Sequence, residues 1–421
     1  MTDLTLTPNR LQGEVTVPPS KSLAHRAIIC AALAEGTSTI SNIQFSDDIK
    51  ATIQGMRAMG AEINEQENAL TIQGIGLQSK SVANDQSEGK ESDPVRTIDC
   101  NESGSTLRFL VPVATLFEGK TGFTGRGKLG QRPLTPYKDL FEKQGLDYDL
   151  KGTERLDLVI GGHLSPDTIK MRGDISSQFI TGLLMTLPFL NGESRIYVTT
   201  PLESKGYIDL TLHVFDLFGL EIKVEDEGQT FVIPGNQKMQ AADYAVEGDF
   251  SQAAFFLTAN HIGNDISLSG LDSQSLQGDK TILDILNKLS DETERVIDGS
   301  QFPDIIPTAA LAAALSKGHT RFTNLERLKI KESDRLAATQ KELEALGADI
   351  QVEGVSLVIQ GVDQLKGGAT VWSHKDHRMA MMLGIASSRC EEPITINDTE
   401  CVAKSYPHFW EDLKLLGGQF K

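Results

Sequence analysis

The chain repeats one structural plan six times, and this repetition limits the folds that are open to it. In the clearest copy a helix is followed by Gly36, a short strand and a second helix. The second helix ends at Met59-Gly60, and a further strand follows it. The copies cover 28–63, 176–224 and 309–350, and weaker ones begin near Ser103, Ser251 and Asp376. Such a unit cannot bury its own apolar faces, so we expect several units to assemble around shared helices.

Chain length indicates two domains with three copies in each. The 421 residues exceed one ordinary core, and six copies correspond to about 70 residues each. We expect the chain to cross between the domains at Pro18-Pro19 and around Gly248. One domain then covers 19–247, and the other combines 1–18 with 248–421. The first short strand would belong to the C-terminal domain.

Composition and charge exclude several kinds of partner. A formal net charge of −18 argues against nucleic acid or an acidic membrane surface, because both reward positive charge. No apolar run approaches the roughly eighteen residues that span a bilayer, and the first residues carry no signal or transit segment. The 4 cysteines lie far apart without a C-x-x-C pair, which predicts buried thiols. We therefore expect a protein of the reducing cytoplasm, with a solvated loop over the hydrophilic stretch 79–94.

Against this acidic background, cationic side chains gather at predicted helix starts. Three segments share the design: PPSKSLAHR at 18–26, KIKESDRLA at 329–337 and KDHRMAMML at 375–383. The cations that they present are Lys21, Arg26, Lys331, Arg335 and Arg378. The first backbone N–H groups of a helix favour anions, and in the second segment Lys331, Glu332 and Arg335 fall within one predicted helical turn. The pattern predicts a small, highly anionic substrate.

Other predicted helix starts carry hydroxyl groups and glycine. Gly104, in NESGSTLRFL at 101–110, would let a ligand approach the backbone. Hydroxyl and amide groups suited to a phosphate monoester are Ser176, Ser177 and Gln178 in GDISSQF, and Ser204 and Tyr207 in ESKGYID. Each of these could instead be an ordinary helix cap. The basic segment GRGKLGQRPL at 125–134 is either a solvated loop or a mobile segment that closes on an anion.

Three further side chains are candidates for proton transfer. Asp304 lies between two prolines ahead of an apolar helix, where it could accept a proton from a substrate hydroxyl or simply cap the helix. Glu332 could form a structural ion pair or relay protons. His377, beside Arg378, is more typical of an orienting residue than of a base. The chain has no P-loop, G-x-G-x-x-G, H-E-x-x-H or G-x-S-x-G pattern, which disfavours nucleotide hydrolysis, hydride transfer and zinc or serine hydrolysis.

Taken together, nine segments resemble the 5-enolpyruvylshikimate-3-phosphate synthase family of enolpyruvyl transferases. In order from residue 18 to 407 they are PPSKSLAHR, SGSTLR, GQRPL, GDISSQF, ESKGYID, FPDIIP, KIKESDRL, DHRMAM and CVAKSYP. The resemblance implies an α/β protein with a two-domain, inverse α/β barrel-like fold. Each domain would hold three βαβαββ units with inner helices, with the active site in the cleft between the domains.

The resemblance also implies a reaction. The enolpyruvyl group of phosphoenolpyruvate would pass to the 5-hydroxyl of shikimate 3-phosphate by addition and elimination through a tetrahedral intermediate. This step belongs to the shikimate pathway to chorismate and the aromatic amino acids. No metal or organic cofactor, a monomer, and inhibition by glyphosate are implied as well.

Site residues follow from the resemblance position by position. Shikimate 3-phosphate would meet Lys21, Ser22, Arg26, Ser176, Ser177, Gln178, Ser204, Tyr207, Asp304 and Lys331. Phosphoenolpyruvate would meet Lys21, Gly104, Arg132, Gln178, Arg335, His377, Arg378 and Lys404. For catalysis, we expect Asp304 to take the hydroxyl proton, while Glu332 and Lys21 share the proton transfers at C3.

Two departures and two alternatives qualify this interpretation. Glu102 and Arg327 stand where relatives often carry asparagine, so we assign them no role. The related transferase acting on UDP-N-acetylglucosamine has the same fold, but many such enzymes carry a cysteine in the basic segment, and 125–134 has none. A non-catalytic repeat scaffold is the other alternative. A scaffold would not explain why Lys21, Asp304 and Glu332 lie at predicted helix starts.

Overall fold

The computed structural model describes residues 3–77, 95–152 and 154–421, and the expected loop over 79–94 lies outside these ranges. The chain splits into two compact units. The continuous unit is Lys21–Val246, and the discontinuous unit combines Met1–Ser20 with Glu247–Lys421.

The continuous unit consists of three helix–strand repeats. The first contains β14 (Tyr244–Ala245), α1 (Lys21–Leu33), β3 (Thr37–Ser41), α2 (Asp47–Ala58), β4 (Glu62–Glu65) and β5 (Ala69–Gln73). The second contains β6 (Arg96–Asp99), α3 (Gly104–Ala114), β7 (Thr121–Gly125), the 3-10 helix η1 (Gly127–Gln131), α4 (Thr135–Gln144), β8 (Asp147–Leu150) and β9 (Leu156–Gly161). The third contains β10 (Thr168–Met171), α5 (Ser177–Leu184), η2 (Leu187–Phe189), β11 (Ser194–Val198), α6 (Lys205–Leu217), β12 (Lys223–Glu225), η3 (Asp226–Gly228) and β13 (Thr230–Ile233).

The discontinuous unit consists of three further repeats. The fourth contains β2 (Gln12–Thr16), α7 (Phe250–His261), β15 (Asp265–Ser269), η4 (Gly278–Thr281) and α8 (Ile282–Asp291). The fifth contains β16 (Glu294–Asp298), α9 (Ile306–Ala314), β17 (His319–Thr323), η5 (Glu326–Ile330), α10 (Arg335–Ala345), β18 (Asp349–Glu353) and β19 (Ser356–Gln360). The sixth contains β20 (Thr370–Trp372), α11 (His377–Ala386), η6 (Ser387–Arg389), β21 (Ile394–Asn397), η7 (Thr399–Lys404), α12 (Phe409–Leu415), β22 (Gln419–Phe420) and β1 (Leu4–Thr7).

One strand order recurs in five of the six sheets found within the described ranges. The first two strands are parallel and the other two pair antiparallel, in the orders β14-β3-β5-β4, β6-β7-β9-β8, β10-β11-β13-β12, β16-β17-β19-β18 and β20-β21-β1-β22. In the sheet of the sixth repeat, β1 pairs with β21 and β22, so that Leu4 lies opposite Ile396 and Leu6 opposite Phe420. The fourth repeat differs from the expected plan: α8 leads directly to β16, so that sheet consists of β2 and β15 alone.

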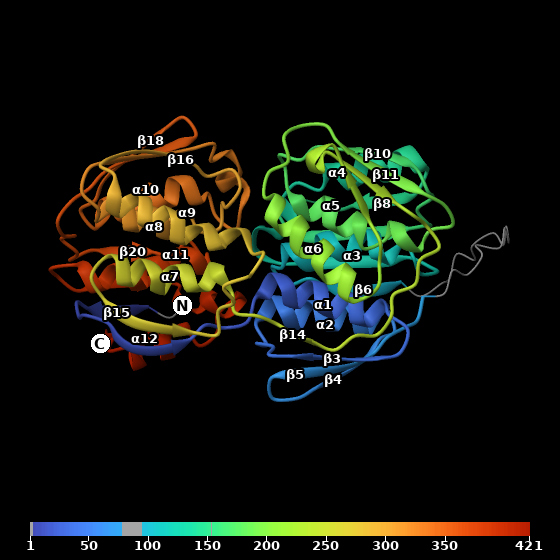
Figure 1. Ribbon diagram of the computed structural model, residues 1–421, viewed down its shortest axis with the longest axis horizontal. Helices are drawn as coiled ribbons and strands as arrows, with labels where there is room; N and C mark the ends of the chain where they lie inside the picture. The colour runs from blue at the N-terminus through green and yellow to red at the C-terminus, as the bar shows by residue number, and fades with distance from the viewer. Residues whose placement is uncertain (1–2, 78–94, 153) are drawn as a thin grey trace. The chain divides into compact units, whose positions relative to one another are not determined.

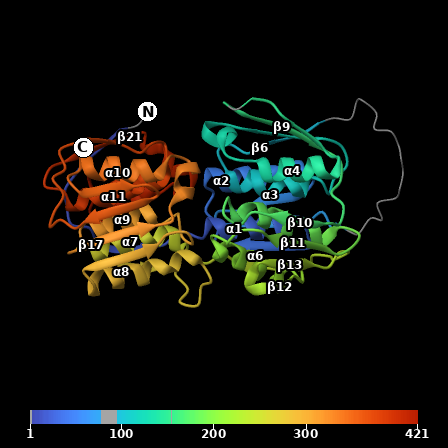
Figure 2. The ribbon, with the colours of Figure 1, turned by 90° about the horizontal axis from the view of Figure 1, so that it is seen from above.

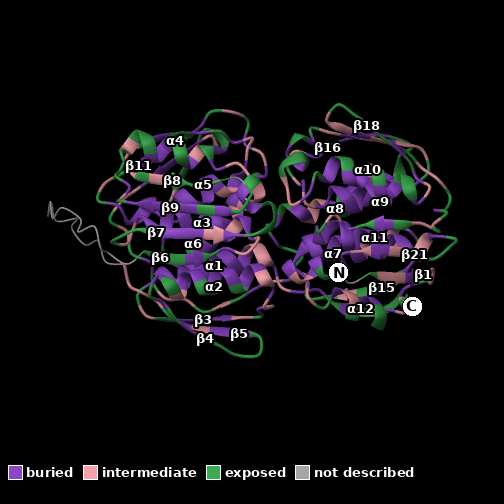
Figure 3. Ribbon diagram, turned by 180° about the vertical axis from the view of Figure 1, so that it is seen from behind, coloured by how far each residue is buried: buried purple, intermediate pink, exposed green. Residues whose placement is uncertain are grey.

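Side-chain patterning explains why the helices lie inside each unit. In α1 every residue from Leu23 to Leu33 is buried, and in α9 all of Ile306–Ala314 are. A helix that is apolar on all sides must be enclosed, and here strands enclose it. The outer strands alternate, as in Glu294–Asp298, where buried and exposed residues take turns. Figures 1 and 2 show α9 and α11 in the interior of their unit, and Figure 3 shows buried residues concentrated on the helices.

Small residues let the inner helices approach closely. A Cβ on Gly182 of α5 would lie 2.3 Å from the carbonyl oxygen of Arg108 in α3 and 2.3 Å from the Tyr137 hydroxyl. That hydroxyl donates to the same carbonyl over 2.6 Å. The contact brings the starts of α3 and α5 together, which places their polar residues side by side. No helix in the described ranges has the length and apolar character needed to traverse a bilayer.

Candidate active site

In the continuous unit, Lys21 opens α1 and forms a sheltered ion pair. Its Nζ lies 2.7 Å from Oδ2 of Asp48 in α2, and the two side chains are only 16% and 11% exposed. Ser22 follows it on the first turn of α1. Asp48 was not among the expected site residues, although an acidic residue in the first turn of a helix is a recognisable sequence signal.

Arg26 lies one turn further along α1 and bridges to α6. Its Nη2 donates to the carbonyl of Tyr207 over 2.8 Å, its Nε donates to Thr211 Oγ1 over 2.8 Å, and its Nη1 donates to the carbonyl of Ser22 over 2.7 Å. Burial lowers the pKa of Arg26 to about 10, so that it remains charged at neutral pH. The guanidinium therefore connects the two helix starts at which Ser22 and Tyr207 lie.

The starts of α3 and α5 form a second polar group in this unit. Ser103 and Ser176 are the N-caps, which accept from the N–H groups of Thr106 over 3.1 Å and of Gln178 over 3.3 Å. The Gln178 amide accepts from Arg108 Nη1 over 2.8 Å and donates to Ser105 Oγ over 2.9 Å. Ser177 is the first residue of α5. Ser103 and Ser176 thus cap their helices. The backbone N–H groups that follow them lie at the helix starts.

Gly104 makes room for Arg132 beside the start of α3. A Cβ on Gly104 would lie 2.6 Å from Arg132 Nη1, so a side chain there would displace the guanidinium. Arg132 follows η1, and Leu129 and Gly130 within that 3-10 helix are buried. The segment 125–134 is therefore packed at Leu129 and Gly130 and exposed at Arg126 and Lys128.

Ser204 precedes α6 in a strained backbone conformation. Its φ of 55° lies in the left-handed region, which costs about 1–3 kcal/mol for a residue with a Cβ. The residue is buried, and the N–H of Tyr207 donates to its carbonyl over 3.1 Å. Lys205, between them, pairs with Asp209 on the surface at 2.7 Å.

A buried chain of polar groups lies beneath these helix starts and was not expected from the sequence. His25 Nδ1 is 2.7 Å from Thr52 Oγ1, which is 2.7 Å from Thr106 Oγ1, which donates to Ser103 Oγ over 2.8 Å. Burial, and then the charges of Lys21 and Arg26, lower the pKa of His25 well below its usual value. A neutral histidine thus connects α1 through α2 to the cap of α3.

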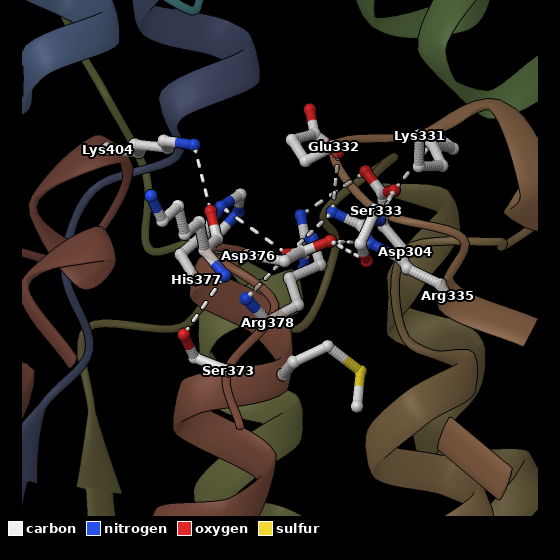
Figure 4. A network of polar contacts seen from close by, with 12 residues as sticks. Asp304, Lys331, Glu332, Ser333, Arg335, Ser373, Asp376, His377, Arg378 and Lys404 are labelled. Carbon is white, nitrogen blue, oxygen red and sulfur yellow. Dashed lines mark hydrogen bonds and ion pairs between the residues drawn. The ribbon is translucent and has the colours of Figure 1, made fainter. Parts of the chain in front are cut away.

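In the discontinuous unit, Asp304 receives three cations (Figure 4). Its Oδ1 accepts from Lys331 Nζ over 3.0 Å and from Arg335 Nη1 over 2.8 Å, and its Oδ2 accepts from Arg378 Nη2 over 3.2 Å. Burial acts to raise the pKa of Asp304, but Arg378, Lys331 and Arg335 together hold it well below the usual range. Ile305 is the N-cap of α9, so Asp304 does not cap that helix.

Arg335 is the most enclosed cation of this group, with a side chain 1% exposed. It donates from Nε to Asp376 Oδ2 over 2.8 Å and from Nη2 to Glu332 Oε2 over 2.8 Å. Asp376 also caps α11, accepting from the N–H of Arg378 over 3.0 Å. Burial acts to raise the pKa of Asp376, but Arg335 outweighs it and brings the value to about 2. The motif contained Asp376, but its partner Arg335 is 41 residues away, so sequence reasoning missed the pair.

The remaining expected residues surround this pair. Burial lowers the pKa of Lys331 to about 8. Lys404, at the end of η7, donates from Nζ to the carbonyl of Lys375 over 3.0 Å. His377 is buried with Nδ1 3.8 Å from Asp376 Oδ1. Helix α10 begins at Arg335, so Lys331 and Glu332 lie before it in the turn after η5, and the expectation of one shared helical turn is wrong.

The chemistry of this network suits an anionic ligand. We call it the cation network: the cations Lys331, Arg335, Arg378 and Lys404 with the carboxylates Asp304, Glu332 and Asp376. Charged N–H donors form strong hydrogen bonds with phosphate and carboxylate groups, and they stabilise charge that develops during a reaction. Within the described ranges no group of three or more His, Cys, Asp or Glu residues could hold a metal ion.

Solved structures define the class of fold. An EPSP synthase from Acinetobacter baumannii superposes with a TM-score of 0.79 at 26% identity, covering 100% of this chain and 99% of that chain. The enolpyruvyl transferase NikO from Streptomyces tendae has a TM-score of 0.75 at 17% identity, covering 100% and 98%. The fold is therefore that of the enolpyruvyl transferases, which confirms the predicted fold class.

Sequence comparison narrows the class to one family. A family model described as EPSP synthase (3-phosphoshikimate 1-carboxyvinyltransferase) matches residues 6–413. The 3-phosphoshikimate 1-carboxyvinyltransferase of Clostridioides difficile (strain 630) is 51% identical over 434 residues, which are 100% of this chain and 98% of that protein. The same-named protein of Clostridium botulinum (strain Alaska E43 / Type E3) is 51% identical over 429 residues, 98% and 97% of the two chains. The chain belongs to the EPSP synthase family.

The Arg335–Asp376 pair leads to a prediction about stability and pH. Asp376→Asn keeps a residue that can cap α11 but removes the charge beside Arg335, and breaking a buried pair costs about 3–5 kcal/mol. We expect a lower melting temperature at pH 7. Because the folded pKa of Asp376 is depressed, its contribution is present above about pH 4 and is lost as the pH falls toward 2.

Thermal unfolding followed by circular dichroism at several pH values checks this prediction. The difference between the two proteins should shrink below pH 4. Asp284→Asn, at an exposed position of α8, is the matched control and should match the unaltered protein. Equal melting temperatures of Asp376→Asn and the unaltered protein at pH 7 would show that the pair does not stabilise the unit.

Proposed function

We propose that this protein transfers the enolpyruvyl group of phosphoenolpyruvate to the 5-hydroxyl of shikimate 3-phosphate, releasing phosphate. The reaction serves the shikimate pathway to chorismate and the aromatic amino acids. Membership of the EPSP synthase family and the names of relatives at 51% identity support this activity. The structural observation that carries the proposal is the cation network, in which Asp304 lies within hydrogen-bond distance of Lys331, Arg335 and Arg378.

Each substrate would meet several of the expected residues. We assign the phosphoenolpyruvate carboxylate and phosphate to Arg335, Arg378 and Lys404, together with Lys21, Arg132, Gln178, His377 and the backbone at Gly104. We assign shikimate 3-phosphate to Ser22, Arg26, Ser176, Ser177, Gln178, Ser204 and Tyr207, with Asp304, Lys331 and Lys21 near its reacting hydroxyl.

The reaction requires three proton transfers, one from the 5-hydroxyl and two at C3, and the departure of one leaving group. The 5-hydroxyl oxygen bonds to C2 of phosphoenolpyruvate while C3 gains a proton, which gives a tetrahedral intermediate. A proton then leaves C3, the bond from C2 to the phosphate oxygen breaks, and phosphate departs. In our proposal Asp304 accepts the hydroxyl proton, and Glu332 and Lys21 serve C3.

Binding would prepare Asp304 for this role. With three cations on it, the carboxylate has a pKa well below its usual value and is a weak base. A substrate anion that binds Arg335 and Arg378 weakens their electrostatic interaction with Asp304. The pKa of Asp304 then rises, and the carboxylate becomes a stronger base. The same cations then neutralise the departing phosphate.

The alternative acceptor, UDP-N-acetylglucosamine, is not favoured. The family model and the curated relatives reported above all concern 3-phosphoshikimate. The segment 125–134 carries no cysteine, and the adjacent hydroxyl groups at the start of α5 suit the phosphate of a small ring.

We also propose that the protein works as a monomer in a reducing cytoplasm. Its 4 cysteines are all buried free thiols, and burial raises the pKa of Cys390 and of Cys401 to about 12, which keeps them protonated. Light scattering should give a molar mass near 45.8 kDa in reducing buffer. A mass twice as large would contradict the monomer.

Release of inorganic phosphate tests the activity itself. Purified protein is given phosphoenolpyruvate and shikimate 3-phosphate, each alone and then together. We expect release only with both, because neither addition nor elimination proceeds without the acceptor hydroxyl. Release with UDP-N-acetylglucosamine in place of shikimate 3-phosphate would move the protein to the sister activity. No release with either acceptor would contradict the proposal.

Asp304→Ala tests the assignment of the base. We expect turnover to fall by about 10²–10⁴-fold, the usual contribution of a positioned acid or base. The KM for phosphoenolpyruvate should not rise, because the freed cations remain available to the anion. Steady-state kinetics with a melting curve separates catalysis from folding, and Asp291→Asn, on the exposed end of α8, is the control. An unchanged rate would remove Asp304 from the mechanism.

A further inference from the structure

The turn between β20 and α11 has an unusual backbone. His374 and Lys375 both lie in the left-handed region, with φ of 55° and 56°. This region is disfavoured for residues that carry a Cβ, so two such residues in succession persist only where surrounding contacts hold them. The turn thus depends on its neighbours for its shape.

This turn positions three members of the cation network. The carbonyl of Lys375 accepts from Lys404 Nζ over 3.0 Å, a contact drawn in Figure 4. The next residue, Asp376, accepts from Arg335 Nε over 2.8 Å and from the N–H of Arg378 over 3.0 Å. A change in the turn would therefore move the partners of Lys404, Arg335 and Arg378 together.

One buried carboxylate holds the turn from α10. Glu342 Oε1 lies 2.7 Å from His374 Nε2, and Glu342 Oε2 accepts from the backbone N–H of Trp372 over 2.9 Å. The Glu342 side chain is 4% exposed and the His374 side chain 15%. Burial acts to raise the pKa of Glu342, but its bonds to His374 and Trp372 lower it below the usual value, so the group is a carboxylate. Since a carboxylate only accepts, His374 Nε2 carries the proton.

Further contacts fix the same segment. The rings of Trp372 and His374 lie 4.3 Å apart at an angle of 33°, and Trp372 Nε1 donates to Asp398 Oδ2 over 2.9 Å. Ser373 Oγ donates to the carbonyl of Asp398 over 3.0 Å and accepts from the N–H of Lys375 over 3.1 Å. Glu342 forms hydrogen bonds with the residues on both sides of Ser373, namely Trp372 and His374.

We propose that Glu342, acting through His374, is a positioning residue for phosphoenolpyruvate. It holds the turn 372–376 in the conformation that points the Lys375 carbonyl at Lys404 and the Asp376 carboxylate at Arg335. The pair touches none of the reacting atoms and acts only through the cations. This inference rests on the proposed function, because it concerns the residues assigned there to phosphoenolpyruvate.

Kinetics of Glu342→Leu and His374→Phe test the inference. Leucine removes both carboxylate oxygens, and phenylalanine keeps a ring against Trp372 but removes the nitrogen. We expect each variant to raise the KM for phosphoenolpyruvate about tenfold or more, since small displacements of binding groups are costly. The KM for shikimate 3-phosphate should stay within about twofold, because the turn positions none of the residues assigned to it. A loss of this form falls on KM more than on kcat.

Two further variants separate positioning from general damage. In Glu342→Gln the amide oxygen can accept from Trp372, and the amide nitrogen can donate to His374 if its proton moves to Nδ1, so we expect a KM near that of the unaltered protein. The double variant Glu342→Leu/His374→Phe should be no worse than the more affected single variant, because both changes break the same contact between Glu342 and His374. Glu344→Gln, at an exposed position of the same helix, is the matched control.

Each outcome decides the question. An unchanged KM for phosphoenolpyruvate, equal rises in both KM values, or additive effects in the double variant would overturn the inference. If Glu342→Leu does not fold, His374→Phe, at a partly exposed position, carries the test alone. If the unaltered protein releases no phosphate with both substrates, the proposed function itself fails, and the inference with it.

Discussion

The structure depends on one constraint: helices that are apolar on all sides must be enclosed, and only their ends can be polar. Helices α1, α9 and α11 are buried along almost their whole length, and strands cover them. The side chains that can bind an ion are therefore confined to the helix starts and to the loops that lead into them. Lys21, Asp304 and Arg378 all occupy such positions. Burial of the core thus determines where the chemistry can be.

Electrostatics inside each unit follows from this confinement. A protein with a net charge of −18 keeps Arg335 within 1% exposure by surrounding it with Asp304, Glu332 and Asp376. These three carboxylates compensate the charge of the buried guanidinium. In the continuous unit Lys21 forms an ion pair with Asp48, and the Gln178 amide forms hydrogen bonds with Arg108 and Ser105.

Local signals predicted much of this architecture, while long-range pairings stayed hidden. The repeat was readable because glycine stops and apolar helices recur along the chain, and it predicted two domains of three units, while the fold class followed from the family resemblance. The fourth repeat has no hairpin, because α8 runs straight into β16, and no residue pattern announced that connection. Asp376 was visible as a repeat start, but its bond to Arg335 links two different repeats. Glu342 resembles any acid on a helix until its contact with His374 is known.

The buried chain from His25 to Ser103 shows the same limit. The members lie on α1, on α2 and at the start of α3, and only the packing of these three helices brings them within 2.7–2.8 Å of one another. Arg26 was expected as a ligand-binding residue from its motif, yet its contacts with Tyr207 and Thr211 come from 181 and 185 residues away. Motifs identify the residue types that a site needs, and tertiary packing decides what holds them.

The pairing of β1 with β21 and β22 has a consequence for how the chain is made. Strand β1 is synthesised long before β21 and β22, its two partners. At usual translation rates of 5–20 residues per second, the first strand waits roughly 20–80 s for them. The continuous unit is complete by Val246, well before the other can close its last sheet. During that interval the N-terminal segment is an unpaired edge, and its few residues and polar neighbours limit its tendency to aggregate.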